Sequence, residues 1–330
     1  MFLAFAVLAT GCSSNPLTAP PKTIEPASPA VSPPPATRPE GELLPLGGYP
    51  QAAIFDERTG SLAVLAPGPD PQSPAILTLF AVSGGTRELT LPGPATALAG
   101  DGHGSAYLST RGGYFTVDLA AGAATPVSIN DETGTDFTAI ARRADGRLVL
   151  GSADGTAYTL GSEAAVSEKV KVFARVDAIV TEGNNAVVLD RGQTSVTSLS
   201  SDGRIQQALR AGEGATSLAA DPLGRVLVTD TRGGQLLVFG VDPLLERQAY
   251  PVPQAPYGLV GSRNLTWVSQ TAVNTVVGYD LTTGIPVEKV RYPTVQQPNS
   301  LAFDDTSDTL YVVSATGAGV QVIRNASGAR

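Results

Sequence analysis

The sequence predicts an all-β protein that forms a seven-bladed β-propeller, with six or eight blades as the alternatives. Short apolar runs rich in β-branched and aromatic residues alternate with turns of Gly, Asp, Asn and Pro from residue 42 onward. The same region has no long stretch with the 3.6-residue periodicity of an amphipathic helix. One short motif also recurs about every 40 residues, which is the length of a propeller blade.

Each copy of the motif contains a small residue, then Ile or Leu, then an apolar residue. Seven copies are visible, and their central residues are 44, 42, 39, 39, 41 and 42 positions apart: Ile54, Leu98, Ile140, Ile179, Leu218, Leu259 and Leu301. A small residue suits the innermost strand of a blade, because strands from all blades crowd round the central channel there. A β-sandwich with chance similarity would not place a small residue at all seven positions.

The last blade needs a strand from elsewhere in the chain. A second apolar run follows every copy of the motif, and a third and a more polar fourth follow in most, but the seventh copy ends after Val320 to Ile323. An unpaired edge at that point would be an aggregation hazard. We therefore expect Glu42 to Leu46 to pair there as the outer strand. Pro45 is compatible with this position, because an outermost strand uses only one side of its ladder.

The N-terminus predicts export and lipidation. Residues 1–11 form a short uncharged apolar stretch that resembles the core of a secretion signal, and the sequence L-A-T-G-C that ends at Cys12 resembles a bacterial lipobox. Cys12, the only cysteine, is then the lipidated residue and the mature N-terminus. No Lys or Arg precedes the apolar stretch, so we expect the true translation start upstream of Met1. The alternative is a free Cys buried in an N-terminal strand.

The segment after Cys12 predicts a tether. Residues 13–41 contain nine of the 26 prolines, which remove backbone donors and keep the segment out of a sheet. We expect an extended, mobile spacer of roughly 90 Å at about 3.1 Å per residue. Its Ser and Thr residues make it a candidate for O-glycosylation. The expected organisation is a signal peptide over 1–11, the lipidated Cys and tether over 12–41, and the propeller over 42–330.

Several repeat copies resemble known propeller families. The runs P-Y-G-L-V at Pro256, P-N-S-L-A-F-D at Pro298 and A-T-S-L-A-A-D-P-L-G-R-V at Ala215 resemble NHL-type and YVTN-type repeats. With the lipobox and the composition, the whole chain resembles the propeller lipoproteins of actinobacteria, mycobacteria among them. This resemblance implies attachment at the extracytoplasmic face of the cell membrane. It fits a binding or scaffolding module for a protein or glycan partner, including an accessory subunit of a membrane complex.

Composition excludes several functions. The formal net charge of -8 disfavours binding to nucleic acid or to anionic lipid headgroups. One His, one Cys and one Met leave few side chains for zinc ligation, thiol chemistry or His-based catalysis, and we expect no cofactor. His103 lies in a turn between the first two strands of blade two. We expect it to be an exposed turn residue rather than a catalytic base.

The remaining candidate residues gather at one end of the channel. The loops that enter the blades and the loops after the second strands share a face, because strand direction alternates. These loops contain the candidate partner-binding residues Asp136, Asp177, Tyr257, Asn299, Arg111, Arg191 and Arg232, with Asp190 and Asp230 beside the arginines. The alternative for the arginine loops is that they are ordinary hairpin turns.

An enzymatic alternative uses the same face. Propeller lactonases hold a divalent cation at the channel mouth with carboxylates and an Asn, and such oxygen ligands suit Ca²⁺. Asp136, Asp177 and Asn299 are weak candidates for such a metal site, because they come from three different blades and no Glu completes the set. The alternative function is thus a metal-dependent, lactonase-like hydrolase.

Overall fold

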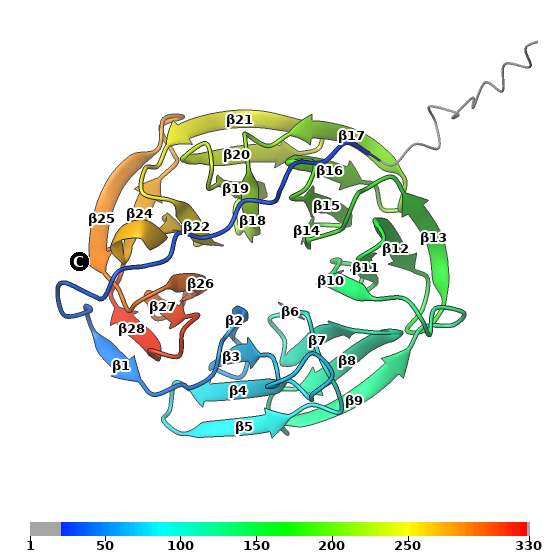
Figure 1. Ribbon diagram of the computed structural model, residues 1–330, viewed down its shortest axis with the longest axis horizontal. Helices are drawn as coiled ribbons and strands as arrows, with labels where there is room; N and C mark the ends of the chain where they lie inside the picture. Colours follow the sequence, from blue (N-terminus) through cyan, green and yellow to red (C-terminus); the bar gives the residue numbers. More distant parts are fainter. Residues whose placement is uncertain (1–20, 329–330) are drawn as a thin grey trace, which may run out of the picture.

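Seven four-stranded antiparallel sheets surround a central channel in the computed structural model, which describes residues 21–328 (Figure 1). The expected seven-bladed propeller is confirmed, and the described residues include one short 3-10 turn, η1 (Thr271–Val273), as their only helical element. The predicted signal peptide and Cys12 lie outside the described residues. Within residues 21–328, no helix has the length and hydrophobicity needed to cross a membrane.

The strands of each blade follow one another in the chain and run from the channel outward. Blade one contains β2 (Ala52–Asp56), β3 (Ser61–Ala66), β4 (Ile76–Ala81) and β5 (Thr86–Thr90). Blade two contains β6 (Ala97–Gly100), β7 (Ser105–Thr110), β8 (Gly113–Asp118) and β9 (Ala123–Ser128). Blade three contains β10 (Phe137–Arg142), β11 (Leu148–Ser152), β12 (Thr156–Leu160) and β13 (Val166–Lys171).

The other half of the ring repeats this arrangement. Blade four contains β14 (Ala178–Glu182), β15 (Asn185–Asp190), β16 (Ser195–Leu199) and β17 (Ile205–Arg210). Blade five contains β18 (Ala215–Asp221), β19 (Arg225–Asp230), β20 (Gln235–Val241) and β21 (Leu244–Pro251). Blade six contains β22 (Pro256–Gly261), β23 (Thr266–Gln270), β24 (Thr275–Asp280) and β25 (Val287–Pro293). Blade seven contains β26 (Pro298–Asp304), β27 (Thr309–Ser314), β28 (Val320–Arg324) and β1 (Glu42–Leu44).

The hydrophobic core lies between neighbouring blades. Second strands such as β3 and β11 are fully buried, whereas outer strands such as β13 alternate half-buried and exposed positions. Between blades one and two, for example, Leu65 and Leu77 pack in one cluster with Leu108 and Phe115. Each blade therefore buries both faces against its neighbours, and the hydrophobic effect favours closing the ring.

The expected closure of the ring is confirmed. β1 pairs antiparallel with β28, with Glu42 opposite Val322 and Leu44 opposite Val320. The strand ends at Leu44, so Pro45 follows it and removes no donor from the ladder. The first strand thereby completes a blade whose other three strands come from the C-terminal end of the chain.

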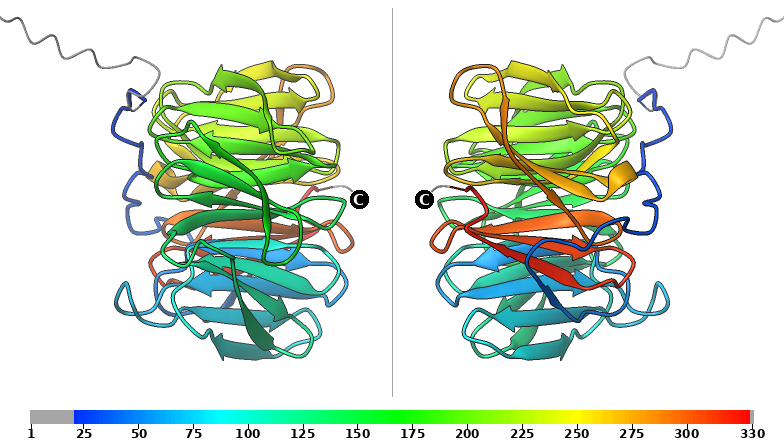
Figure 2. Two further views of the ribbon diagram at one scale, coloured as in Figure 1. Left: turned by 90° about the vertical axis from the view of Figure 1, so that its right-hand side faces the viewer. Right: turned by 90° about the vertical axis from the view of Figure 1, so that its left-hand side faces the viewer.

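The described part of the tether does not project away from the propeller. Residues 21–41 form no strand, as expected, but they run along one flat face of the ring, over blades four to seven, before turning to β1 (Figures 1 and 2). Prolines remove backbone donors but keep their carbonyl acceptors. Loop side chains of the propeller supply donors to carbonyls of this segment, as at Pro33 and Ala30. The expectation of a free spacer is therefore wrong for this stretch.

Candidate functional site

The two flat faces of the ring carry different loops. The face called here the mouth face is formed by the loops that enter each blade and by the loops between second and third strands. The opposite face carries the loops from first to second and from third to fourth strands. All seven candidate partner-binding residues lie in mouth-face loops or beside them, and residues 21–33 cover part of the same face (Figure 2).

Polar side chains, most of them buried, tie the mouth-face loops together. The last residue of the second strand hydrogen-bonds the loop that enters its own blade in five of the seven blades, through Thr110, Asp190, Asp230, Gln270 and Ser314. These residues fix the loops on which candidate binding residues stand. Their signal in the sequence is a polar residue that recurs at one position of the repeat, and sequence analysis missed it.

Asp190 and Asp230 belong to this set and are not binding residues. Both are fully buried. Asp230 accepts hydrogen bonds from the backbone N–H groups of Glu213, Gly214 and Gly233 at 2.9, 2.8 and 2.9 Å. A carboxylate that is enclosed by N–H donors stabilises its loops and offers nothing to a partner. The suggestion that these two carboxylates help to dock a partner is therefore wrong.

Two of the three candidate arginines bind the N-terminal segment. Arg191 lies in the β15–β16 loop, and its Nη2 donates to the carbonyl oxygen of Ala27. Arg232 lies in the β19–β20 loop, and its Nη2 donates to the carbonyl oxygen of Glu25 at 2.8 Å. The hypothesis that these arginines bind a chain is consistent with this geometry, but the bound chain is part of the same molecule.

Arg111 and Asp136 lie on the uncovered part of the face. Arg111 follows β7 and forms an isolated backbone bridge with Asp136, which precedes β10. Both residues are exposed, and Arg111 Nη1 donates to the carbonyl oxygen of Gly134 at 3.1 Å. A cation and an anion thus stand side by side on blades two and three, where residues 21–33 do not run.

Asp177 is held by its neighbours. Its Oδ1 lies 3.2 Å from Arg175 Nε, and its Oδ2 accepts the backbone N–H of Arg191 at 2.7 Å. Burial raises the pKa of this carboxyl above its ordinary value, although the hydrogen bond and the charges of Arg191 and Arg175 act in the other direction. A partly desolvated carboxylate with these partners positions the Arg191 loop.

The weak candidate metal ligands have other partners. Asn299 Oδ1 accepts a hydrogen bond from Gln297 Nε2 at 3.0 Å, and Asp177 forms an ion pair with Arg175. Nowhere in residues 21–328 do three or more His, Cys, Asp or Glu side chains gather in a way that could hold a metal ion. Tyr257 is half-buried, and its carbonyl oxygen accepts from Thr229 Oγ1 at 2.9 Å. The face therefore offers polar and aromatic contacts rather than an assembled cation site.

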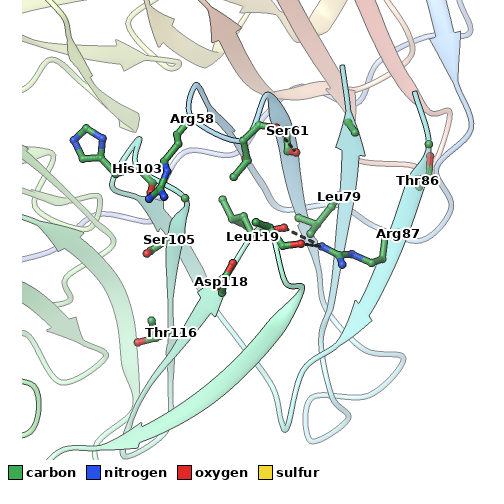
Figure 3. A pocket seen from close by; sticks show the side chains of 15 residues that line it. Arg58, Ser61, Leu79, Thr86, Arg87, His103, Ser105, Thr116, Asp118 and Leu119 are labelled. Atoms are coloured by element: carbon green, nitrogen blue, oxygen red, sulfur yellow. Dashed lines mark hydrogen bonds between the residues drawn. The ribbon is translucent and has the colours of Figure 1, made fainter. Parts of the chain in front are cut away.

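The opposite face contains a cleft of about 690 Å³ between blades one and two (Figure 3). Arg58 Nη1 donates to the carbonyl oxygen of His103 at 2.6 Å, and Arg87 donates to three carbonyls of the β8–β9 turn. His103 is exposed in the β6–β7 turn, as expected, and Figure 3 shows its imidazole pointing away from Asp118. The guanidinium groups of Arg58 and Arg87 are thus engaged with backbone carbonyls in the walls of the cleft.

Solved structures with the same architecture are numerous and diverse. A streptogramin B lyase matches with a TM-score of 0.70 and 12% identity, over 87% of this chain and 97% of that one. The catalytically inactive histidine-to-alanine variant of virginiamycin B lyase from Staphylococcus aureus, with quinupristin, matches with a TM-score of 0.69 and 10% identity, over 85% and 97%. A chain of the mitotic checkpoint complex matches with a TM-score of 0.70 and 12% identity, over 91% and 98%.

The likeness is one of fold. No protein-family model matches the sequence, and the comparison with curated proteins found no match. At identities of 10–12%, one architecture is shared by a lyase and by a subunit of a multiprotein assembly. The shared fold therefore does not specify a function, which depends on the surface of each chain.

Proposed function

We propose that the protein is a binding or scaffolding module of the cell envelope, lipid-anchored through Cys12, which docks a protein or glycan on its mouth face. One observation carries the choice of surface. The mouth-face loops of blades four to seven already hold an extended length of chain, through Arg191, Arg232 and neighbouring polar side chains. Loops that bind a chain in this way, on a rigid ring, suit a docking module better than they suit the metal-dependent hydrolase.

The docked segment shortens the tether. Only residues 13–20 separate Cys12 from the described chain, and at about 3.1 Å per residue these eight residues reach about 25 Å instead of roughly 90 Å. A lipid on Cys12 would then keep the mouth face near the bilayer. The net charge of -8 disfavours direct binding to anionic headgroups, which supports a membrane-associated protein or a glycan as the partner.

The uncovered blades offer the access for such a partner. Arg111 and Asp136 are exposed there, and Arg is enriched at interface centres, where its loss costs about 2 kcal/mol or roughly thirtyfold in affinity. We expect Arg111→Glu to weaken partner capture to that extent without unfolding the propeller. The matched control is Arg204→Glu, which reverses a charge in the exposed β16–β17 turn of the opposite face and should leave capture unchanged.

Crosslinking in native membranes, with the crosslinked residues identified by mass spectrometry, tests the proposal. Crosslinks should concentrate on the mouth-face loops of blades one to three and should decrease in Arg111→Glu. Crosslinks on the opposite face or on the outer strands would refute the choice of surface. Anchoring is tested separately: Cys12→Ser should abolish lipid labelling and detergent partitioning, and an unchanged lipid label would refute lipidation at this cysteine.

A further inference from the structure

Residues 24–33 are bound to the propeller by nine hydrogen bonds. Three of them use backbone N–H groups of the segment. The acceptors are the carbonyl oxygen of Gly192 for Ile24 at 2.8 Å, Thr271 Oγ1 for Ala30 at 3.1 Å and Gln297 Oε1 for Ser32 at 3.0 Å. The three acceptors lie in loops of three different blades, namely blades four, six and seven.

Side chains of the propeller also donate hydrogen bonds to the carbonyl oxygens of the segment. Five side chains from four successive blades donate to them: Arg191 to Ala27, Arg232 to Glu25, Gln297 to Ala30, Gln296 to Ser32 and Asn274 to Pro33. The last three distances are 3.0, 2.9 and 2.7 Å. A proline-rich chain has carbonyls without intrachain partners, so an array of donors along its path is a suitable recognition surface.

Two small side chains of the segment are buried in this surface. Ala27 is 6% exposed and Ser32 is 3% exposed, and Ser32 Oγ donates to the carbonyl oxygen of Thr271 at 2.6 Å. Two glycines of the propeller loops, Gly192 and Gly214, lie directly against the segment. A Cβ at Gly214 would lie 3.0 Å from Ala27 Cβ, and a Cβ at Gly192 would lie 3.2 Å from Thr23 Cγ2. Larger side chains at these points would crowd the segment.

Two residues of these loops have a left-handed backbone conformation, which is unfavourable for most residues other than glycine. Asn274 and Gln297 have φ values of 49° and 55°, in the left-handed region that favours glycine. Both side chains nevertheless bind the segment, since Asn274 donates to the carbonyl oxygen of Pro33 and Gln297 to that of Ala30, and a glycine at either position could not do so.

We propose that the mouth face of blades four to seven is a recognition groove for extended proline-rich peptides, and that residues 23–33 are its intramolecular ligand. The groove selects an extended backbone with a small residue at the position of Ala27 and a Ser five residues later. A short linker holds such a ligand at an effective concentration on the order of millimolar. A partner that uses Arg191 or Arg232 must displace the segment; this consequence alone depends on the proposed function.

The test releases the segment without touching the propeller. The variant Ile24→Pro/Ala30→Pro/Ser32→Pro removes the three bound N–H donors from residues that lie outside every strand. The matched control Lys22→Pro/Ser28→Pro/Val31→Pro places three prolines at exposed positions whose N–H groups donate no bond to the groove. Both are made in the full chain with Cys12→Ser, and equal thermal transitions of the β-sheet circular dichroism signal confirm an intact ring.

The probe is a fluorescent synthetic peptide with the sequence of residues 22–35. It should bind the released variant saturably, and it should bind the unmodified chain and the control at least tenfold more weakly, because the segment of the chain competes with it. The same peptide with prolines at the three donor positions should not bind. Equal affinity for all three proteins, or no binding to the released variant, would overturn the proposal.

Amide hydrogen exchange in the unmodified chain gives an independent readout. The amides of Ile24, Ala30 and Ser32 should be protected, and those of Glu25, Ser28 and Val31 should exchange freely. Uniform fast exchange would overturn docking, and protection that depends on protein concentration would assign the bound segment to a second copy. Neither assay uses lipid or a partner, so failure of the groove and failure of the proposed function are distinguishable.

Discussion

Asp230→Asn tests whether the recurrent polar residue at the end of the second strand holds the mouth face together. Asp230 Oδ2 accepts from the N–H of Glu213, and Oδ1 accepts from Gly214 and Gly233. An Asn of the same shape has one oxygen. It can keep the two bonds made by Oδ1, but its amide NH₂ then faces the N–H of Glu213, and two donors cannot pair.

The expected loss of stability follows from the burial and the charge of Asp230. Asp230 is fully buried, and a hydrogen bond to a charged group contributes about 1.5–3 kcal/mol. Asp230→Asn loses one such bond, so the free energy of unfolding should fall by about 1.5–3 kcal/mol. Asp230→Ala leaves all three donors without their acceptor, and the expected loss is about 3–5 kcal/mol.

Urea unfolding measures these losses, and Trp267, the only tryptophan, is a fully buried fluorescent probe in blade six. Asp70→Asn is the matched control, because Asp70 is exposed in the loop before β4 and its removal should change stability by less than about 0.5 kcal/mol. If Asp230→Asn and Asp70→Asn unfold at the same urea concentration, the loop-holding role of Asp230 is refuted.

Two further predictions concern stability. Deleting Glu42 to Leu46 should lower the free energy of unfolding by a few kcal/mol, because β28 loses its outer partner and Leu44 and Leu46 leave their hydrophobic cluster. Replacing residues 23–33 with Gly and Ser should lower it by less. Equal losses in the two variants would contradict the closure. Although burial acts to raise it, hydrogen bonds from Lys171 and Ser152 lower the pKa of Asp154 to about 2. The exposed ion pair of Asp154 with Lys171 adds a small stabilisation, which is present above pH 3.8 and is lost as the pH falls through about 2. Urea midpoints between pH 2 and 5 should therefore depend less on pH in Asp154→Asn, and an unchanged pH profile would contradict the pairing.

The sequence by itself predicted seven blades, with six or eight as alternatives, and it determined the closure of the ring and the face of each loop. A repeat of about 40 residues corresponds to one blade, and seven small residues such as Ala53 and Ser217 mark the inner strands. Strand alternation then assigns loops to faces. The unpaired edge of β28 required a partner, and Glu42 to Leu46 was the free segment. These features follow from local periodicity and from pairing rules that hold for any β-sheet.

The tertiary structure alone decided what covers the mouth face. Composition correctly excluded a strand from residues 21–41, but their partners are Gly192, Thr271 and Gln297, which lie 168 to 265 positions away in the chain. Nothing in a proline-rich run specifies which donors will meet its carbonyls, because those donors come together only when the ring closes. For the same reason Asp190 and Asp230 resembled surface carboxylates in the sequence. Their burial depends on the loops that enter their blades, which fold over them only in the assembled ring.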